Sequence, residues 1–77
     1  MSKTPAAGGF AEAVAANVRA RAAARQVSQR DLADALDLSI NAVNRRYRGL
    51  FPWALDEIAA IAPMLGCEPS DLTRVGA

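Results

Sequence analysis

Histidine is absent from this sequence of 77 residues, and cysteine occurs once, as Cys67. The chain therefore cannot form an internal disulfide or a metal site of the His/Cys type. A lone cysteine with no histidine to act as its base also provides no nucleophilic constellation. We expect no enzymatic activity, no metal and no cofactor, and we interpret Cys67 as a small apolar filler in a reducing, intracellular protein.

Aromatic residues and long apolar runs are also scarce. Only 5% of the residues are aromatic, although 52% are hydrophobic. Apolar volume must therefore come from Val, Leu and Ile on closely packed helices, and strand-like alternation is absent, so an all-α fold is predicted. No apolar run suits a signal peptide or approaches the roughly 18 residues of a membrane span. We expect a soluble, cytoplasmic protein with one small domain.

The net charge of +1 conceals an uneven distribution of charge along the chain. Residues 17–50 contain seven arginines and three aspartates, a net charge of +4, whereas residues 51–77 contain one arginine and four acidic residues, a net charge of −3. A phosphate-binding surface supported by an acidic region has this distribution. Two solvated faces of opposite sign are the alternative explanation.

The pattern of apolar residues predicts a compact bundle flanked by short ends. Residues 1–9 are expected to form a flexible arm, residues 10–73 the domain, and residues 74–77 a C-terminal tail. The first helix should run from Phe10 to about Gln26. A fourth helix should run from about Ala54 to Leu65 with a distorted end at Pro63, followed by one closing helical turn around Leu72. Their expected apolar faces comprise Phe10, Val14 and Val18 in the first helix, and Leu55, Ile58, Ala59, Ile61, Ala62 and Leu65 in the fourth.

Between these helices, the stretch from Ser28 to Gly49 is predicted to form two short helices joined by a tight turn. Ser28 and Ser39 are typical N-cap residues, and Asp31 completes a capping box with Ser28. Val43 is expected to point inward and anchor the second of these helices. Gly49 should end that helix in the left-handed conformation.

The second helix of this pair is apolar at its inward positions and mostly polar at its outward positions. Counted from Ser39, its early outward positions carry Ile40, Asn41, Asn44 and Arg45. Asparagine can pair bidentately with adenine and arginine with guanine, each pair contributing about 1 to 3 kcal/mol of discrimination. We therefore predict that these four residues read DNA bases, Ile40 being limited to a thymine methyl group or a sugar.

A further set of residues is predicted to contact DNA phosphates. Gln29 lies in the first turn of its helix, where free backbone amides and the positive end of the helix dipole favour anions. Arg46 and Arg48 lie at the far end of the second helix, away from the floor of the groove. Tyr47 is expected either to pack inward with its hydroxyl on a phosphate or to belong to the core alone. The predicted phosphate contacts are Gln29, Ser28, Ser39, Arg46, Arg48 and Tyr47.

Two large aromatic residues, Phe51 and Trp53, follow this stretch. In so small a domain they are expected to form the lid of the core. An exposed Trp53 would instead mark a dimer surface.

Together these motifs resemble the lambda-repressor-like helix-turn-helix family of phage repressors, Cro proteins and bacterial regulators. The resemblance extends from about Asn17 to Leu72. It depends on V-S-Q-R-D-L-A at 27–33, A-L-D-L-S at 35–39, N-R-R-Y-R-G at 44–49 and L-D-E-I-A-A-I-A-P-M-L-G at 55–66. It implies a compact five-helix domain in a bacterial host cell, with the helix after Ser39 in the major groove. Ile40 departs from the polar residue common at its position.

We therefore expect a sequence-specific regulator of transcription that binds double-stranded DNA, of the Cro or small phage-type repressor kind. No membrane partner and no small-molecule substrate are expected. A homodimer on a palindromic operator and a monomer on one asymmetric site are both compatible with the sequence. The alternative is a protein-interaction module, such as an antitoxin or anti-repressor, that uses Phe51, Trp53 and the acidic C-terminal half as its contact surface.

Overall fold

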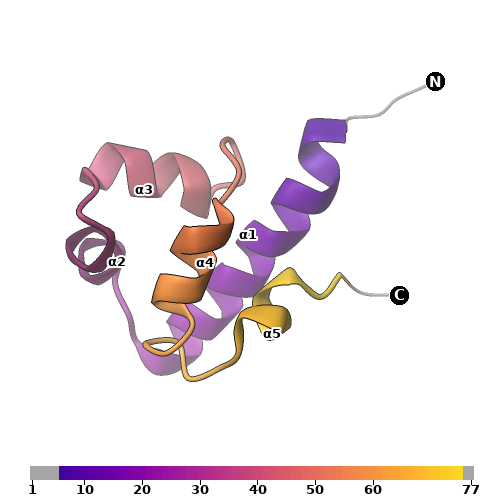
Figure 1. Cartoon of the computed structure of the whole chain (residues 1–77). Helices are drawn as coiled ribbons and strands as arrows, with labels where there is room; N and C mark the ends of the chain where they lie inside the picture. The colour runs from indigo at the N-terminus through magenta and orange to yellow at the C-terminus, as the bar shows by residue number, and fades with distance from the viewer. Residues whose placement is uncertain (1–5, 76–77) are drawn as a thin grey trace.

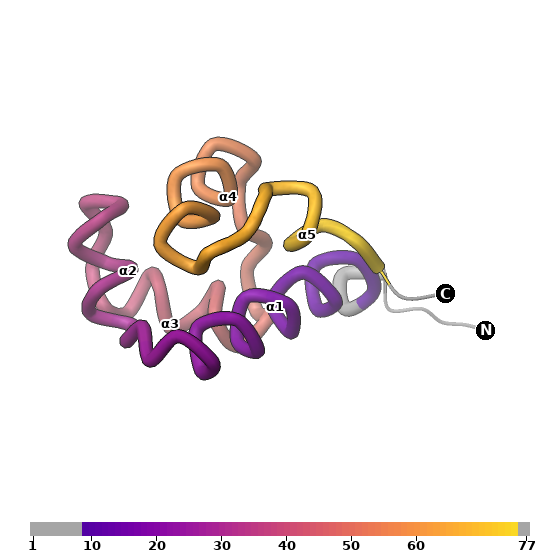
Figure 2. Tube along the Cα trace, turned by 90° about the horizontal axis from the view of Figure 1, so that it is seen from below, coloured from indigo at the N-terminus to yellow at the C-terminus, as the bar shows by residue number. Residues whose placement is uncertain are grey.

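The computed structural model describes residues 6–75, which form α1 (Ala6–Arg25), α2 (Gln29–Leu36), α3 (Ile40–Tyr47), α4 (Leu55–Ile61) and α5 (Pro69–Thr73). No strand occurs in this part of the chain, in agreement with the predicted all-α class. Figure 1 shows α1 running across the molecule behind α4, with α2 and α3 at one end. Seen from below in Figure 2, α4 lies across the core from α1, and α5 lies on the side away from α2.

The first helix is longer than predicted. It begins at Ala6 rather than Phe10, so residues 6–9, which we expected in the arm, are helical. The remaining residues of the expected arm, 1–5, lie outside the described residues, as do 76 and 77 of the expected tail.

The core contains residues from all five helices. Val14 and Val18 are buried in α1, as their spacing predicts, and Ala22 continues the same stripe. Phe10 was expected to continue this stripe, but 57% of its surface is exposed. The reason is visible in Figure 1, where the first turns of α1 extend beyond the other helices. The full core is Val14, Val18, Ala22, Leu32, Ala33, Val43, Trp53, Ile58, Ile61, Ala62, Leu65 and Leu72.

The buried face of α4 is narrower than predicted. Ile58 and Ile61 are buried, but Leu55 is 78% exposed and Ala59 is also exposed. With 3.6 residues per turn, Leu55 and Ala59 lie at the edge of the face that Ile58 and Ile61 occupy. The helix ends at Ile61, and residues 62–66 continue as turns around Pro63, which has no backbone N–H to donate.

The loop between α3 and α4 separates its two aromatic residues. Trp53 is only 6% exposed and belongs to the core, which confirms the prediction of a lid and removes Trp53 from any contact surface. Phe51 was also expected in the lid, but it is 47% exposed. Its ring lies against Arg46, whose Cζ is 4.7 Å from the ring centroid. Cys67 packs against the core as a partly buried residue, as expected for a filler.

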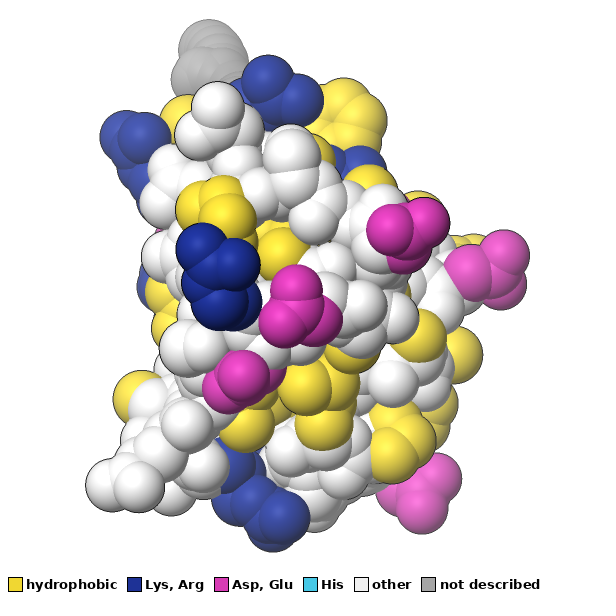
Figure 3. Space-filling model, turned by 90° about the vertical axis from the view of Figure 1, so that its left-hand side faces the viewer, with side chains coloured by type: hydrophobic (Ala, Val, Ile, Leu, Met, Phe, Trp, Pro, Cys, Tyr) yellow, Lys and Arg dark blue, Asp and Glu magenta, His cyan; other side chains and the backbone are white. Residues whose placement is uncertain are grey.

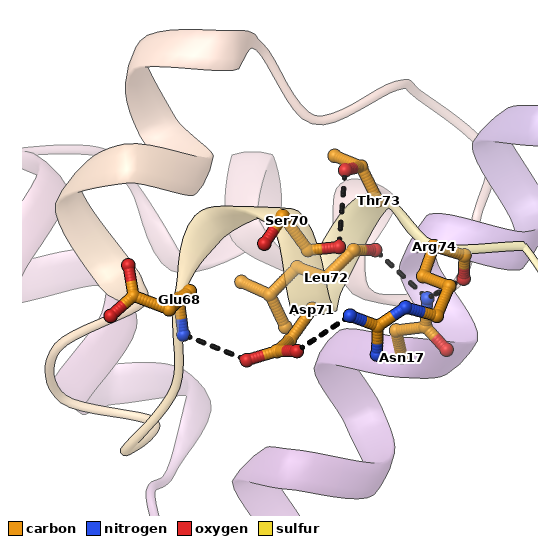
Figure 4. A network of polar contacts seen from close by, with 7 residues as sticks. All are labelled: Asn17, Glu68, Ser70, Asp71, Leu72, Thr73 and Arg74. Atoms are coloured by element: carbon orange, nitrogen blue, oxygen red, sulfur yellow. Dashed lines mark hydrogen bonds and ion pairs between the residues drawn. The ribbon is translucent and has the colours of Figure 1, made fainter.

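The last helix, α5, closes the domain on α1. Leu72 is fully buried, as predicted. Figure 4 shows the side-chain amide of Asn17 in α1 donating to the carbonyl oxygens of Leu72 and Arg74, at 2.9 and 2.8 Å. The Asp71 carboxylate accepts a hydrogen bond from the Glu68 amide at 2.9 Å and pairs with Arg74 at 3.1 Å. The Asn17 bonds attach α5 to α1, and the Asp71 contacts stabilise the two ends of α5.

Two helix-capping carboxylates lead to a prediction about pH. Hydrogen bonds from the amides of Ser28 and Glu68 hold the pKa values of Asp31 and Asp71 below the ordinary value of 3.8. A lowered pKa in the folded state stabilises the protein above the pKa of the unfolded chain, and this stabilisation is lost as the pH falls through the folded value. We expect the melting temperature to fall as the pH drops below 3.8.

The check is thermal unfolding, followed by circular dichroism, of the wild type and the double variant Asp31→Asn/Asp71→Asn. Asparagine keeps an oxygen that can accept the capping hydrogen bond but cannot titrate in this range. The double variant should therefore lose part of the acid dependence of its melting temperature. A double variant with the full acid dependence of the wild type would contradict this assignment.

Candidate nucleic-acid interface

The starts of α2 and α3 are built by two serine caps, as predicted. Ser28 and Ser39 both have extended backbones. The Ser28 hydroxyl oxygen accepts from the Asp31 amide at 3.0 Å, and the Ser39 hydroxyl oxygen accepts from the Ala42 amide at 3.1 Å. The Asp31 carboxylate completes the capping box by accepting from the Ser28 amide at 3.0 Å. These local bonds determine where each helix begins.

A tight turn sets the direction of α3 relative to α2. Asp37 ends α2 in the left-handed conformation, with φ of 57°, and its amide donates to the carbonyl oxygens of Ala33 and Asp34. The Leu38 amide donates to the Ala33 carbonyl at 3.0 Å, and the Leu38 side chain packs against the core. The turn therefore satisfies the end of α2 and directs the chain at once into α3.

Contacts with α1 hold the far end of α3. Val43 is fully buried and anchors the helix, as predicted. Arg19 of α1 donates to the Tyr47 carbonyl oxygen at 2.9 Å and to the Glu12 carboxylate at 3.0 Å. A cation at this position satisfies a free carbonyl at the negative end of the helix dipole. Gly49 follows in the predicted left-handed conformation, with φ of 81°, and the Glu12 carboxylate occupies the space that a side chain at Gly49 would need.

Two of the predicted DNA-contacting residues meet at the centre of the motif. The Asn44 side-chain amide donates to the Gln29 side-chain oxygen at 3.2 Å, which joins the first turn of α2 to the middle of α3. Both side chains are half-buried. Each retains further hydrogen-bonding groups, the amide N–H groups of Gln29 and the carbonyl oxygen of Asn44.

Three predicted contact residues lie along the outer face of α3 and its C-terminal cap. Asn41, Arg45 and Arg48 are exposed and follow one another at i, i+4 and i+7, the spacing of one helical face. We call these three residues the outer row. Ile40, at the start of the same helix, is 39% exposed. The outer row thus presents an amide and two guanidinium groups from one face.

Arg46 is not part of this row, although it was predicted to contact phosphate. Its side chain is only 12% exposed, and its Nε pairs with the Glu57 carboxylate at 2.9 Å. Tyr47 packs its ring partly against the core, as expected on either reading of this residue. Helical periodicity could not place Arg46 on the inner side, because that placement depends on a carboxylate from α4.

One basic residue of this surface was assigned no role from the sequence. Arg30 follows Gln29 in the first turn of α2 and is exposed. Its position beside a predicted phosphate contact was the signal that could have identified it. Figure 3 shows basic side chains at the top, left of centre and at the bottom of this side of the molecule, and acidic side chains in its middle and on its right.

Residues 6–75 lack the features of a small-molecule or metal site. This part of the chain contains no pocket and no group of three or more His, Cys, Asp or Glu residues placed to hold a metal ion. None of its helices is long and apolar enough to cross a membrane.

Comparison with known proteins identifies the family of this chain. The family model of the Cro/C1-type HTH DNA-binding domain matches residues 17–75, which is more than half of the chain. Searches among curated proteins and among solved structures gave no match. The matched residues include both helices of the motif, the outer row, and the helices that support them. The chain therefore belongs to the Cro/C1-type helix-turn-helix DNA-binding family.

Proposed function

We propose that this protein is a sequence-specific transcriptional regulator of the Cro or small phage-type repressor kind, which inserts α3 into the major groove of double-stranded DNA. The observation that carries the proposal is the outer row. Asn41, Arg45 and Arg48 project from a helix whose start is capped by Ser39 and whose end is held by Arg19. Rigid support of this kind is needed if side chains are to find particular base edges.

The roles of the individual residues follow from their positions. Asn41 and Arg45 would read base edges, with Ile40 touching a thymine methyl group or a sugar. Asn44 would contact a base while bonded to Gln29, so that Gln29 supports the reading helix and contacts a phosphate.

The remaining polar groups of the surface would bind the DNA backbone. Arg48, Ser28, Ser39 and the Tyr47 hydroxyl are proposed phosphate contacts, and we add exposed Arg30 to them. Arg46 is omitted, because its guanidinium is already paired with Glu57.

The test is selection of bound duplexes from a random DNA pool, followed by titration of the selected and a scrambled duplex at several salt concentrations. We expect one enriched sequence. The logarithm of the binding constant should fall with the logarithm of salt concentration by about 0.9 for each phosphate neutralised. Failure to enrich any sequence, or an affinity that salt does not change, would contradict the proposal.

The selected sequence also reports symmetry. A palindrome with half-sites about 34 Å apart would indicate a homodimer, whereas a single asymmetric site would indicate a monomer.

The alternative of a protein-interaction module is favoured by one observation. Leu50, Phe51 and Leu55 are exposed apolar residues close together in the sequence, although Trp53 is not available to such a surface. A chain that binds no DNA but forms a stable complex with another protein would support this alternative.

A further inference from the structure

The Arg46 guanidinium is held on several sides. Its Nε donates to the Glu57 carboxylate at 2.9 Å, and one terminal nitrogen donates to the Ala42 carbonyl oxygen at 3.0 Å. The Phe51 ring lies 4.7 Å from the guanidinium carbon, at a distance typical of a cation–π contact. Only 12% of the Arg46 side chain and 18% of the Glu57 side chain are exposed. This guanidinium is therefore largely withdrawn from solvent.

The same carboxylate oxygen organises the start of α4. Besides the Arg46 Nε, Glu57 Oε1 accepts a hydrogen bond from the Ala54 amide at 2.9 Å. Ala54 is the N-cap of α4 and has no side-chain oxygen with which to cap the helix. Glu57 thus joins the inner side of α3 to the first turn of α4.

This link constrains the rotation of α3. Arg46 directly follows Arg45, so the two side chains point about 100° apart around the helix axis. Holding Arg46 against Glu57 of α4 therefore adds to the constraints from Val43, α1 and α2 on the direction in which Arg45 and Asn41 leave the helix. A change in this direction would displace the tips of these long side chains, and recognition of base edges tolerates little displacement.

We propose that the Arg46–Glu57 ion pair is a positioning device that orients α3 on α4 and so determines which bases Arg45 and Asn41 reach. The proposal rests on the proposed DNA-binding function. It assigns Arg46 no contact with DNA. A largely buried ion pair adds little net stability compared with apolar residues, but it penalises arrangements in which either charge loses its partner.

Removing each partner has a different consequence. Arg46→Gln removes the cation and loosens α3. Glu57→Gln keeps an oxygen that can accept from both Ala54 and Arg46 but removes the counter-charge of the guanidinium, so α3 is held less firmly while the cation remains in place.

The experiment compares these variants with the wild type on the selected and scrambled duplexes at several salt concentrations. Arg46→Gln should lower the ratio of the two affinities about tenfold, comparable to the loss of one base contact, and leave the salt dependence unchanged. Glu57→Gln should lower the ratio by less than Arg46→Gln does, and it should also leave the salt dependence unchanged because it adds no phosphate contact.

Arg74→Gln is the matched control, since it breaks an ion pair of the same type between Arg74 and Asp71, on α5. It should change neither the affinity ratio nor the salt dependence. Arg46→Lys keeps the charge but has neither the guanidinium fork nor the flat face that stacks on Phe51. Its affinity ratio for the two duplexes should therefore lie between those of Arg46→Gln and the wild type.

A second measurement needs no DNA. In NMR spectra of the free protein, the amide signals of Asn41 and Arg45 should shift in Glu57→Gln, a substitution in α4 that neither residue adjoins in the sequence, while those of α5 stay in place. Unchanged Asn41 and Arg45 signals would overturn the positioning role. If Arg46→Gln does not fold, Arg46→Lys and Glu57→Gln still provide the ratio of the two affinities.

The DNA measurements contain a second outcome that would overturn the proposal. In this outcome, Arg46→Gln weakens binding to both duplexes equally, and the slope of the logarithm of the binding constant against the logarithm of salt concentration becomes shallower by about 0.9. Arg46 would then contact a phosphate directly. A wild type that binds neither duplex would refute the proposed function, whereas the NMR shifts would still test the orientation of α3.

Discussion

Arg45→Ala should remove most of the preference of this protein for its selected DNA sequence over a scrambled one. Arg45 lies in the middle of the outer row and is exposed, so its guanidinium is free to form a bidentate contact with guanine. Loss of such a contact costs about 1 to 3 kcal/mol of discrimination. The measurement is the ratio of the dissociation constants of the two duplexes at one salt concentration.

The matched control is Arg48→Ala, which removes the same charge at the end of α3. It should weaken binding to both duplexes about equally. The slope of the logarithm of the binding constant against the logarithm of salt concentration should become shallower by about 0.9. Arg45 also accepts hydrogen bonds from the amides of Leu50 and Phe51, but through its backbone carbonyl, which the alanine variant retains. Equal losses on both duplexes in the two variants would refute the division into base-reading and phosphate-binding arginines.

Leu32→Ala should leave a large fraction of the protein unfolded. Leu32 is fully buried in α2, and truncation of a buried leucine to alanine costs about 2 to 5 kcal/mol. A single core in a domain of this size rarely supplies more than about 3 to 5 kcal/mol of stability. The expected loss therefore approaches the whole free energy of unfolding, which urea titration followed by circular dichroism measures.

Leu55→Ala is the control with the same change in side chain. Leu55 is the first residue of α4, and because it is 78% exposed its truncation should change stability by less than about 0.5 kcal/mol. Similar losses from both variants would show that Leu55 is buried in solution, as its spacing in the sequence predicts.

The helix-turn-helix itself could be predicted well because its signals are local. Ser28 and Ser39 each accept a hydrogen bond from an amide only three residues away, so the two helix starts are encoded within one turn. Gly49 marks the end of the motif, because a residue with φ of 81° favours glycine. The inward position of Val43 follows from helical periodicity.

The features that could not be predicted concern residues whose spatial neighbours are distant in the sequence. Phe10 and Leu55 have the spacing of core residues, but both are exposed. Phe10 lies where α1 extends past the other helices (Figure 1), and Leu55 lies at the edge of the buried face of α4. The contacts that Glu57 and Phe51 make with the Arg46 guanidinium were likewise not predicted, and the phosphate contact of Arg46 stays an untested prediction. Periodicity shows which residues share a helical face, but not whether another element covers that face.

By itself the sequence determined an all-α domain, the starts of α2 and α3, the inward anchor Val43 and the polar outer side of α3. These features depend on hydrogen bonds and periodicity within a few residues. The tertiary structure decided how α3 is held, through Arg46 and Glu57, 11 positions apart, and through Arg19 and Tyr47, 28 positions apart. Such pairs form only when separate helices pack, because helical periodicity carries no information about which residues from other helices will meet them.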